Sequence, residues 1–275
     1  LKPADYGRAL IFLVTYPFHV CKFIGGLGGS VEDRLLSFAL WKTLDTVILK
    51  NYMRYLFGKK LSYLKNSEIK CISWYENQAS DKIFFRGLRH VSRKVKIFGA
   101  QLNLRAENLL NVYPDESEIS FGVLSDKVLV NGPGYHLGLK VIPEEVAPSL
   151  RYGKLFRIKV DPARGDIVLI ILPYHDHVSR YILGLIKEVD WPVGVKIKLH
   201  PTTKKDKYVD QISSEFLVTD EDLYVLFCRA RMVVGRSTGA LVEAACLGIP
   251  TIEIAGSAKF SHDFMPEDGR GVLWD

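Results

Sequence analysis

The sequence predicts an α/β fold of two domains, each with a parallel sheet and crossover helices, and with a helical segment at the N-terminus. Three observations lead to this fold class. From residue 68 onward, short runs rich in Val and Ile alternate with amphipathic runs, the order expected of a parallel sheet. The later short runs are apolar throughout, as in strands covered on both faces. In the first 65 residues, apolar side chains instead recur at helical spacing.

Length and composition fit this fold and narrow the class of partner. A chain of 275 residues accommodates two domains, and 48% hydrophobic with 25% charged residues is typical of a globular protein. The net charge of +6 suits an anionic partner. Because the sequence has no RNA-binding signature, zinc-finger spacing or long basic tract, nucleic acid is disfavoured as that partner.

The cysteines and the first apolar run indicate a cytoplasmic protein. The four cysteines are far apart, and Cys228 and Cys246 fall in apolar helical patterns, so we expect reduced core thiols. No secretory signal is visible. The apolar run 10–24 is interrupted by Pro17, His19 and Lys22, and we expect it to be too short to span a bilayer.

The N-terminal segment is expected to be helical, with Ser30 capping a helix that begins at Val31. Its later part combines lysines with aromatic side chains, a composition compatible with a peripheral contact with anionic lipid of the inner membrane. Packing against the first domain is the favoured interpretation. The residues concerned are Lys59, Lys60, Lys65, Tyr55, Phe57 and Tyr63.

The rest of the chain divides into two series of alternating elements. In the first domain, assigned to residues 1–160, we expect strands at 68–75, 94–100 and 126–132 and a helix at 79–93. In the second domain, residues 161–275, we expect strands at 166–173, 193–201, 231–235 and 250–256, and helices at 178–189, 221–230 and 239–248. Two such Rossmann-like domains would face each other across a cleft, and ligands bind at the carboxyl edges of their sheets.

Two motifs of the second domain end strands at the same predicted edge. In "KLHP" (198–201), His200 can donate to a phosphate and Pro201 stiffens the turn. In "GRSTG" (235–239), Ser237, Thr238 and Gly239 form the start of a helix, where free amides and the helix dipole favour an anion. Glu243, further along that helix, suits a ribose diol. The alternative is a plain N-cap with a solvated glutamate, but the pairing of the motifs favours a nucleotide site.

A carboxylate and two amides end the first strand of the first domain. In this turn, Glu76 is our candidate general base for an acceptor hydroxyl, and Asn77 and Gln78 are candidate sugar contacts. The alternative is a turn that only caps the following helix.

The "PYHDH" turn (173–177) ends the first strand of the second domain. His175 is a candidate contact to the donor, and Asp176 is the reserve base. A His-x-His turn can bind metal, but no third ligand is evident, so we expect no metal site. Arg151 is a candidate for a phosphate or carboxylate, or for an interdomain salt bridge. The basic loop 202–207 is expected to be solvated.

These motifs together resemble a known enzyme class. "KLHP" followed by "GRSTGALVEAACLGIPTIEI" is similar to the nucleotide-binding half of GT-B glycosyltransferases, nearest to those that use CMP-activated sugars (sialyl- and Kdo-transferases) and to CDP-glycerol polymerases. "WYENQASDKIFFRGLR", "IFGAQ", "DKVLVNGPG" and "SLRY" resemble bacterial surface-carbohydrate biosynthesis proteins. The resemblance implies nucleotide contacts for His200, Pro201, Ser237, Thr238 and Glu243. Leu102 stands where such relatives often have His.

The sequence therefore predicts a metal-independent glycosyltransferase of GT-B type without a cofactor. Its donor would be a nucleotide sugar, CMP-linked by resemblance, and its acceptor a glycan or a lipid-linked glycan. Three alternatives stay open at this point. They are a CDP-glycerol-type phosphotransferase, a nucleotide-sugar epimerase, and an inactive glycan-assembly subunit on the same fold.

Overall fold

The computed structural model describes residues 2–63, 68–90, 95–102, 104, 109–149 and 151–255. Packing divides the chain into two compact units, and each unit is built from several separate segments of the chain. The first unit holds residues 1–101, 111–129 and 138–145, and the second holds 102–110, 130–137 and 146–275. The predicted single cut after residue 160 has no counterpart in this division, because three segments before residue 160 pack with the second unit.

The first unit combines a four-stranded sheet with helices on one face. The strand order is β1-β2-β3-β4, and β1 to β3 run parallel. Side chains of α3 and α4 pack on β1 and β2 around the buried Phe85, Leu88, Val95 and Ile97. The elements are α1 (Pro3–Gly25), α2 (Val31–Lys42), α3 (Thr46–Ser62), β1 (Ile69–Trp74), α4 (Ala79–Leu88), β2 (Val95–Ala100), α5 (Ser117–Phe121), β3 (Lys127–Val130) and β4 (Glu144–Val146).

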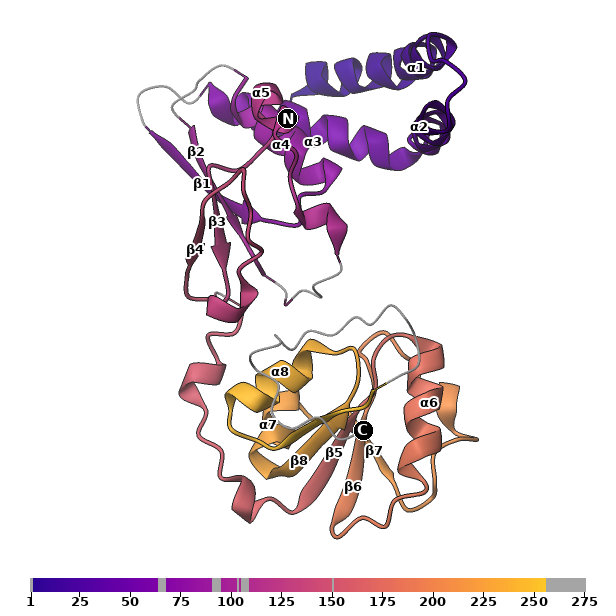
Figure 1. The fold of residues 1–275 in the computed structure, drawn as a ribbon, viewed down its shortest axis with the longest axis vertical. Coiled ribbons are helices and arrows are strands. Elements are labelled where there is room, and N and C mark those ends of the chain that lie inside the picture. The colour runs from indigo at the N-terminus through magenta and orange to yellow at the C-terminus, as the bar shows by residue number, and fades with distance from the viewer. Residues whose placement is uncertain are drawn as a thin grey trace. The chain divides into compact units, whose positions relative to one another are not determined.

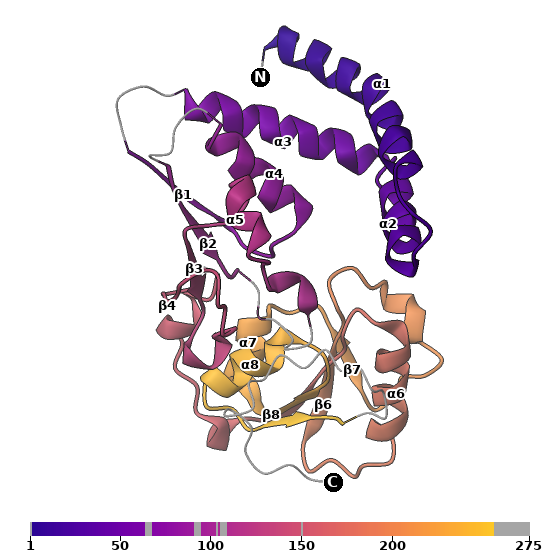
Figure 2. The ribbon, with the colours of Figure 1, turned by 45° about the horizontal axis from the view of Figure 1, so that its top comes forward.

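Helices α3 and α4 touch through their backbones, as both ribbon views show (Figures 1 and 2). Two glycines make this approach possible. A Cβ at Gly58 would lie 2.7 Å from the Phe84 carbonyl oxygen, and one at Gly87 would lie 2.4 Å from the Tyr55 carbonyl oxygen. Any larger residue at either position must therefore push the helices apart.

The second unit is a five-stranded parallel sheet with helices on both faces (Figure 1). Its strand order is β7-β6-β5-β8-β9, the doubly wound order. Helix α6 packs on one face, and helices α7 and α8 pack on the other. The elements are β5 (Ile167–Ile171), α6 (Asp176–Ile186), β6 (Gly194–Lys198), β7 (Leu217–Thr219), α7 (Leu223–Arg229), β8 (Ala230–Gly235), α8 (Gly239–Cys246) and β9 (Thr251–Glu253).

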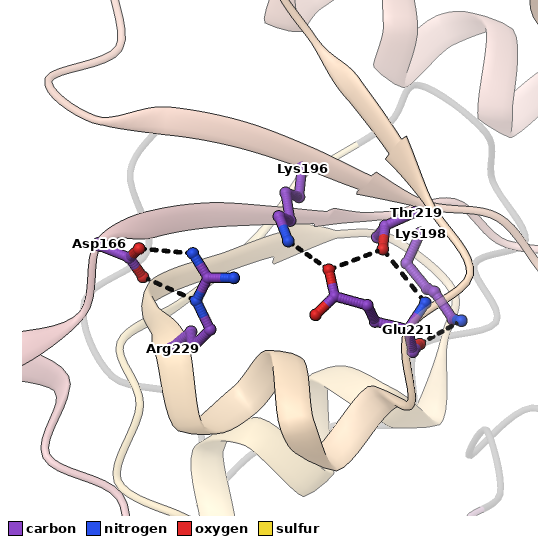
Figure 3. A network of polar contacts seen from close by, with 6 residues as sticks. All are labelled: Asp166, Lys196, Lys198, Thr219, Glu221 and Arg229. Atoms are coloured by element: carbon purple, nitrogen blue, oxygen red, sulfur yellow. Dashed lines mark hydrogen bonds and ion pairs between the residues drawn. The ribbon is translucent and has the colours of Figure 1, made fainter.

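A polar network ties α7 to the strands of the second sheet (Figure 3). Lys196 is a nearly buried lysine on β6, and its ammonium group pairs with the Glu221 carboxylate. That hydrogen bond lowers the pKa of Glu221, against the raising effect of burial. At the other end of α7, Arg229 Nη2 lies 2.5 Å from Asp166 Oδ2. Both ends of the helix are therefore tied to residues that begin or form strands.

The prediction of two α/β units with parallel sheets behind a helical segment is confirmed for the described residues. The apolar spacing continued from Val31 to Ile48, but the structure divides it into two helices. Asp45 causes the break, because its carboxylate accepts a hydrogen bond from Val47 N at 2.8 Å and starts α3. Strands β4 and β7 were not predicted; each has three residues and little apolar pattern.

Two expectations are wrong, one about the length of the first apolar helix and one about the exposure of two cysteines. Helix α1 runs without a break through Pro17, so by length and composition it could cross a membrane, the single such helix among the described residues. Cys228 and Cys246 are exposed rather than buried, because the apolar side chains around them face the core from the other side of each helix.

We predict that Gly58→Ala lowers the free energy of unfolding of the first unit by about 1–3 kcal/mol, because the new methyl group meets backbone atoms of α4. Urea denaturation followed by circular dichroism measures the change. Gly184→Ala in α6 is the control, because its Cβ meets no atom within 4 Å. That control should stabilise its helix by about 0.5–1 kcal/mol. Equal effects of both variants would contradict the close approach.

Candidate functional site

Three loops of the second unit leave the same sheet edge in register. Strand pairing aligns Ile171 of β5 with Lys198 of β6 on one side and with Gly235 of β8 on the other. His200 and Ser237 each lie two residues beyond that row. The chain runs from β5 to β6 on one side and later returns to β8 on the other. The gap between β5 and β8 is thus the topological switch point, where ligands of such sheets bind.

The turn after β8 has an unusual backbone. Ser237 has φ 50°, and Asn77 is the only other non-glycine residue with positive φ in the described part of the chain. Thr238 is the N-cap of α8, because its hydroxyl accepts a bond from Ala240 N at 3.4 Å. The backbone N–H groups of Ser237 and Thr238 and the Ser237 hydroxyl have no hydrogen-bond partner within the described residues. Such a turn presents a group of free donors to an anion.

The glycines and the arginine of this turn have structural roles. A Cβ at Gly235 would lie 2.8 Å from the Ile171 carbonyl oxygen, and one at Gly239 would lie 3.3 Å from Leu104 Cδ1. Arg236 is buried, and its Nη1 donates to the Ile254 carbonyl oxygen at 3.3 Å. The arginine therefore holds the segment after β9 in place rather than offering its charge to a ligand.

His200 is oriented by the residue that follows Pro201. Its Nδ1 accepts a hydrogen bond from Thr202 N at 3.3 Å and lies 2.8 Å from Thr202 Oγ1. We infer from this geometry that the neutral ring carries its proton on Nε2, which is then a free donor. The loop predicted to be merely solvated lines a pocket beside Tyr174, and its members there are Thr202, Thr203, Lys204, Asp206 and Lys207.

Aromatic rings from the loop after β5 lie beside His200. The Tyr174 ring centroid is 4.2 Å from that of His175 and 6.0 Å from that of His200. Asp176 begins α6 and pairs with Arg180 at 3.2 Å and Lys207 at 3.3 Å. Burial raises the pKa of Asp176, but the hydrogen bond from Arg180 and the ion pair with Lys207 lower it further, so the net pKa falls. A carboxylate held in this way is a weak base, and its role as reserve base stays a prediction.

Glu243 is half-buried and hydrogen-bonded rather than solvated. Tyr224 of α7 donates its hydroxyl to Glu243 Oε2 at 2.8 Å. Burial raises the pKa of the Glu243 carboxyl, while the Tyr224 bond and the Arg151 charge act in the opposite direction. Arg151 lies over the ring of Tyr152, with its guanidinium carbon 5.7 Å from the ring centroid. Arg151 and Glu243 therefore share one polar cluster of the second unit.

The Glu-Asn-Gln turn of the first unit is held by a second segment of the same unit. Asn77, with φ 52°, donates from Nδ2 to the Asn111 carbonyl oxygen at 3.0 Å. Asn111 returns a bond from its Nδ2 to the Glu76 carbonyl oxygen at 2.8 Å. Asp81 Oδ2 accepts bonds from the N–H groups of Glu76 and Gln78, so the turn also caps α4. The capping alternative is therefore confirmed, and a functional role for this turn stays a prediction.

A pocket of the first unit opens beside this turn between α3, β1 and α4. Gln78 donates from Nε2 to Glu76 Oε2 at 2.7 Å, so one oxygen of the carboxylate is occupied and the other is available. Arg54 has no ion pair or hydrogen bond with any described residue. The lining combines aromatic faces with groups that bind hydroxyls: Arg54, Phe57, Ser73, Trp74, Glu76, Gln78, Ser80, Asp81 and Phe84.

Sequence reasoning missed several residues of these two sites. Tyr224 and Asn111 act through contacts with residues 19 and 34 positions away, which no local pattern signals. Arg54 and Trp74 sit in ordinary amphipathic patterns. The described residues contain no group of three or more His, Cys, Asp or Glu side chains arranged to hold a metal.

Comparisons with solved structures give distant likenesses. No family model and no curated protein matches the chain. Among solved structures, the chain is similar to a UDP-N-acetylglucosamine 2-epimerase from Rickettsia bellii, with 16% identity and a TM-score of 0.44. The match covers 77% of this chain and 62% of that one.

We predict that two substitutions at Ser237 separate the backbone of the turn from its hydroxyl. Ser237→Gly should raise the free energy of unfolding by about 1 kcal/mol, because glycine adopts φ 50° without strain. Ser237→Ala keeps the strain and removes a hydroxyl without a partner among the described residues, so stability should change by less than about 0.5 kcal/mol. Chemical denaturation measures both. A loss of stability in Ser237→Gly would contradict the left-handed backbone at this position.

Proposed function

We propose that the protein transfers a glycosyl unit from a nucleotide sugar to a glycan or lipid-linked glycan. The observation that carries the proposal is the row of three strand ends at the switch point. It combines the free Nε2 of His200 with the unpaired donors of Ser237 and Thr238. A CMP-linked donor and a surface polysaccharide as product follow from the sequence resemblance alone. A cytoplasmic location follows from the cysteine pattern and from the absence of a visible secretory signal.

The donor phosphate fits the turn after β8. The Ser237 hydroxyl and the N–H groups of Ser237 and Thr238 would bind the phosphate oxygens at the N-terminus of α8. His200 would donate from Nε2 to the same group, and Pro201 keeps the loop rigid. Glu243 would accept hydrogen bonds from the ribose hydroxyls, with Tyr224 holding its carboxylate in place. Arg151 and His175 supply further polar groups toward the phosphate and the sugar.

The acceptor is assigned to the pocket of the first unit. Trp74 and Phe57 offer apolar ring faces to a sugar, and Gln78 and Asn77 lie in the turn that carries Glu76. The free oxygen of the Glu76 carboxylate would take the proton of the acceptor hydroxyl. The hydroxyl oxygen then forms a bond to the anomeric carbon of the donor sugar, and the bond from that carbon to the phosphate oxygen breaks.

Stabilisation of the departing phosphate replaces a metal in this mechanism. Negative charge develops on the phosphate oxygen as the glycosyl bond breaks. Fixed donors aimed at that oxygen lower the barrier because they need no reorganisation during the reaction. The left-handed backbone at Ser237 supports this assignment, because such strain is found most often at ligand-binding turns.

We predict that a nucleotide stabilises the protein and that His200→Ala weakens its binding. In thermal-shift measurements with CMP, CDP, UDP and GDP, the preferred nucleotide at 100 times its dissociation constant should add about 2.7 kcal/mol. His200→Ala should raise the dissociation constant about tenfold, because one hydrogen bond to a charged group is lost. His19→Ala on exposed α1 is the control. A wild-type protein that no nucleotide stabilises would refute the nucleotide site.

We also predict that Glu76→Gln separates binding from transfer. Nucleotide affinity should stay unchanged, and the transfer rate should fall by about 100-fold or more because the base is lost. Glu68→Gln at the opposite end of β1 is the matched control. Mass analysis of the products identifies the reaction. Growth of the acceptor by one sugar supports transfer, whereas an added glycerol phosphate or an epimerised donor without growth would overturn it.

A further inference from the structure

The N-terminal helices present large apolar side chains outward. On α1, Leu10, Val14 and Phe18 recur every four residues and are 62%, 65% and 73% exposed. Helix α2 buries none of its residues, and Leu35 and Phe38 stand out from it. We call the side chains of Leu10, Ile11, Val14, Phe18, Leu35 and Phe38 the apolar face. Soluble monomers rarely leave so many large apolar groups uncovered on neighbouring helices.

The opposite side of α1 is anchored, which fixes the direction of the apolar face. Asp5 pairs with Lys60 of α3, and the Phe12 and Tyr52 rings stack with centroids 4.0 Å apart. Tyr16 Oη lies 2.7 Å from Thr43 Oγ1 at the end of α2. The ribbon views show α1 and α2 at the side of α3 away from the sheet of the first unit (Figures 1 and 2).

Positive charge is concentrated in the same part of the chain. Residues 1–65 contain ten Lys or Arg and four Asp or Glu, a difference of +6, which equals the net charge of the whole protein. The remaining 210 residues are therefore neutral overall. Lys22 and Lys42 lie in the last turns of α1 and α2, and the Lys42 ammonium group is 5.2 Å from the Phe38 ring centroid. Cations beside an apolar stripe are the pattern of helices that lie in a membrane interface.

We infer that the apolar face docks on an anionic lipid bilayer, with α1 and α2 lying in the interface. The positive charge of this segment and the anchoring of α1 on α3 identify the bilayer as the partner of the apolar face. A second copy would bring two segments of +6 together, which electrostatic repulsion opposes. A span by α1 would have to break the Asp5–Lys60 pair or carry it into hydrocarbon. An anionic surface attracts the cations while the headgroup region takes up the apolar side chains.

Flotation of the full-length protein with lipid vesicles tests the inference. The protein should bind vesicles of phosphatidylcholine with about 30% phosphatidylglycerol, bind pure phosphatidylcholine more weakly, and dissociate at high salt. Leu10→Ser with Phe18→Ser should weaken binding at least about tenfold, because two buried apolar groups are lost. Lys22→Gln with Lys42→Gln should cost about fivefold per cation on the anionic vesicles.

The matched controls come from exposed sites of the second unit. Tyr181→Ser with Val225→Ser removes apolar side chains of 48% and 51% exposure, and Lys187→Gln removes an exposed cation. These variants should bind vesicles as the wild type does. Nucleotide binding in solution should be unchanged in every variant, so this test is independent of the proposed reaction. Circular dichroism and the melting temperature check that each variant is folded.

Three outcomes would overturn the inference. The first is wild-type protein that floats with neither vesicle, or serine variants that float as well as the wild type. The second is a wild-type dimer in analytical ultracentrifugation that the serine variants convert to monomer without any lipid effect, which would assign the face to a second copy. The third is wild-type protein that resists alkaline extraction from the vesicles, which would make α1 a membrane span.

Discussion

The position of β5 between β6 and β8 is the constraint on which the candidate site depends. Parallel strands end at one edge, and the register Lys198–Ile171–Gly235 brings the following loops to the same level. The reversal of strand order at β5 keeps a crossover from covering the space between β5 and β8. Residues 175, 200 and 237 are far apart in sequence, and this arrangement brings their loops to the same edge of the sheet.

Backbone strain marks both candidate sites. Ser237 and Asn77 are the two non-glycine residues with positive φ in the described ranges, and each follows a strand of a different sheet. Such positions cost about 1–3 kcal/mol each and persist where the surroundings hold them. The backbone at Asn77 is held by hydrogen bonds exchanged with Asn111. The backbone at Ser237 is held by the Thr238 cap and by the bond of the buried Arg236 to the segment after β9. Both sites therefore share a polar turn with a left-handed residue shortly after a strand.

The sequence was sufficient for the order of elements and for the motif positions, because apolar runs and turn residues are local signals. It was insufficient where a residue distant in sequence determines the environment of a side chain or the conformation of a turn. Glu243 reads as a solvated helix residue until Tyr224 is placed beside it, and the left-handed backbone of Ser237 leaves no trace in "GRSTG". The exposure of α1 and α2 was missed for a related reason. Helical spacing reports that one face is apolar, but it does not report whether protein covers that face.

The interleaving of the two units bears on the order in which the chain can fold during synthesis. The chain passes between the units after residues 101, 110, 129, 137 and 145. Leu104, Tyr135 and Tyr152 therefore leave the ribosome well before the residues of α8 against which their cluster packs. The first unit has all its segments once residue 145 has emerged, whereas these early side chains of the second unit stay uncovered until Val242 follows. Vectorial synthesis thus favours completion of the first unit first, with the turn after β8 as one of the last parts to form.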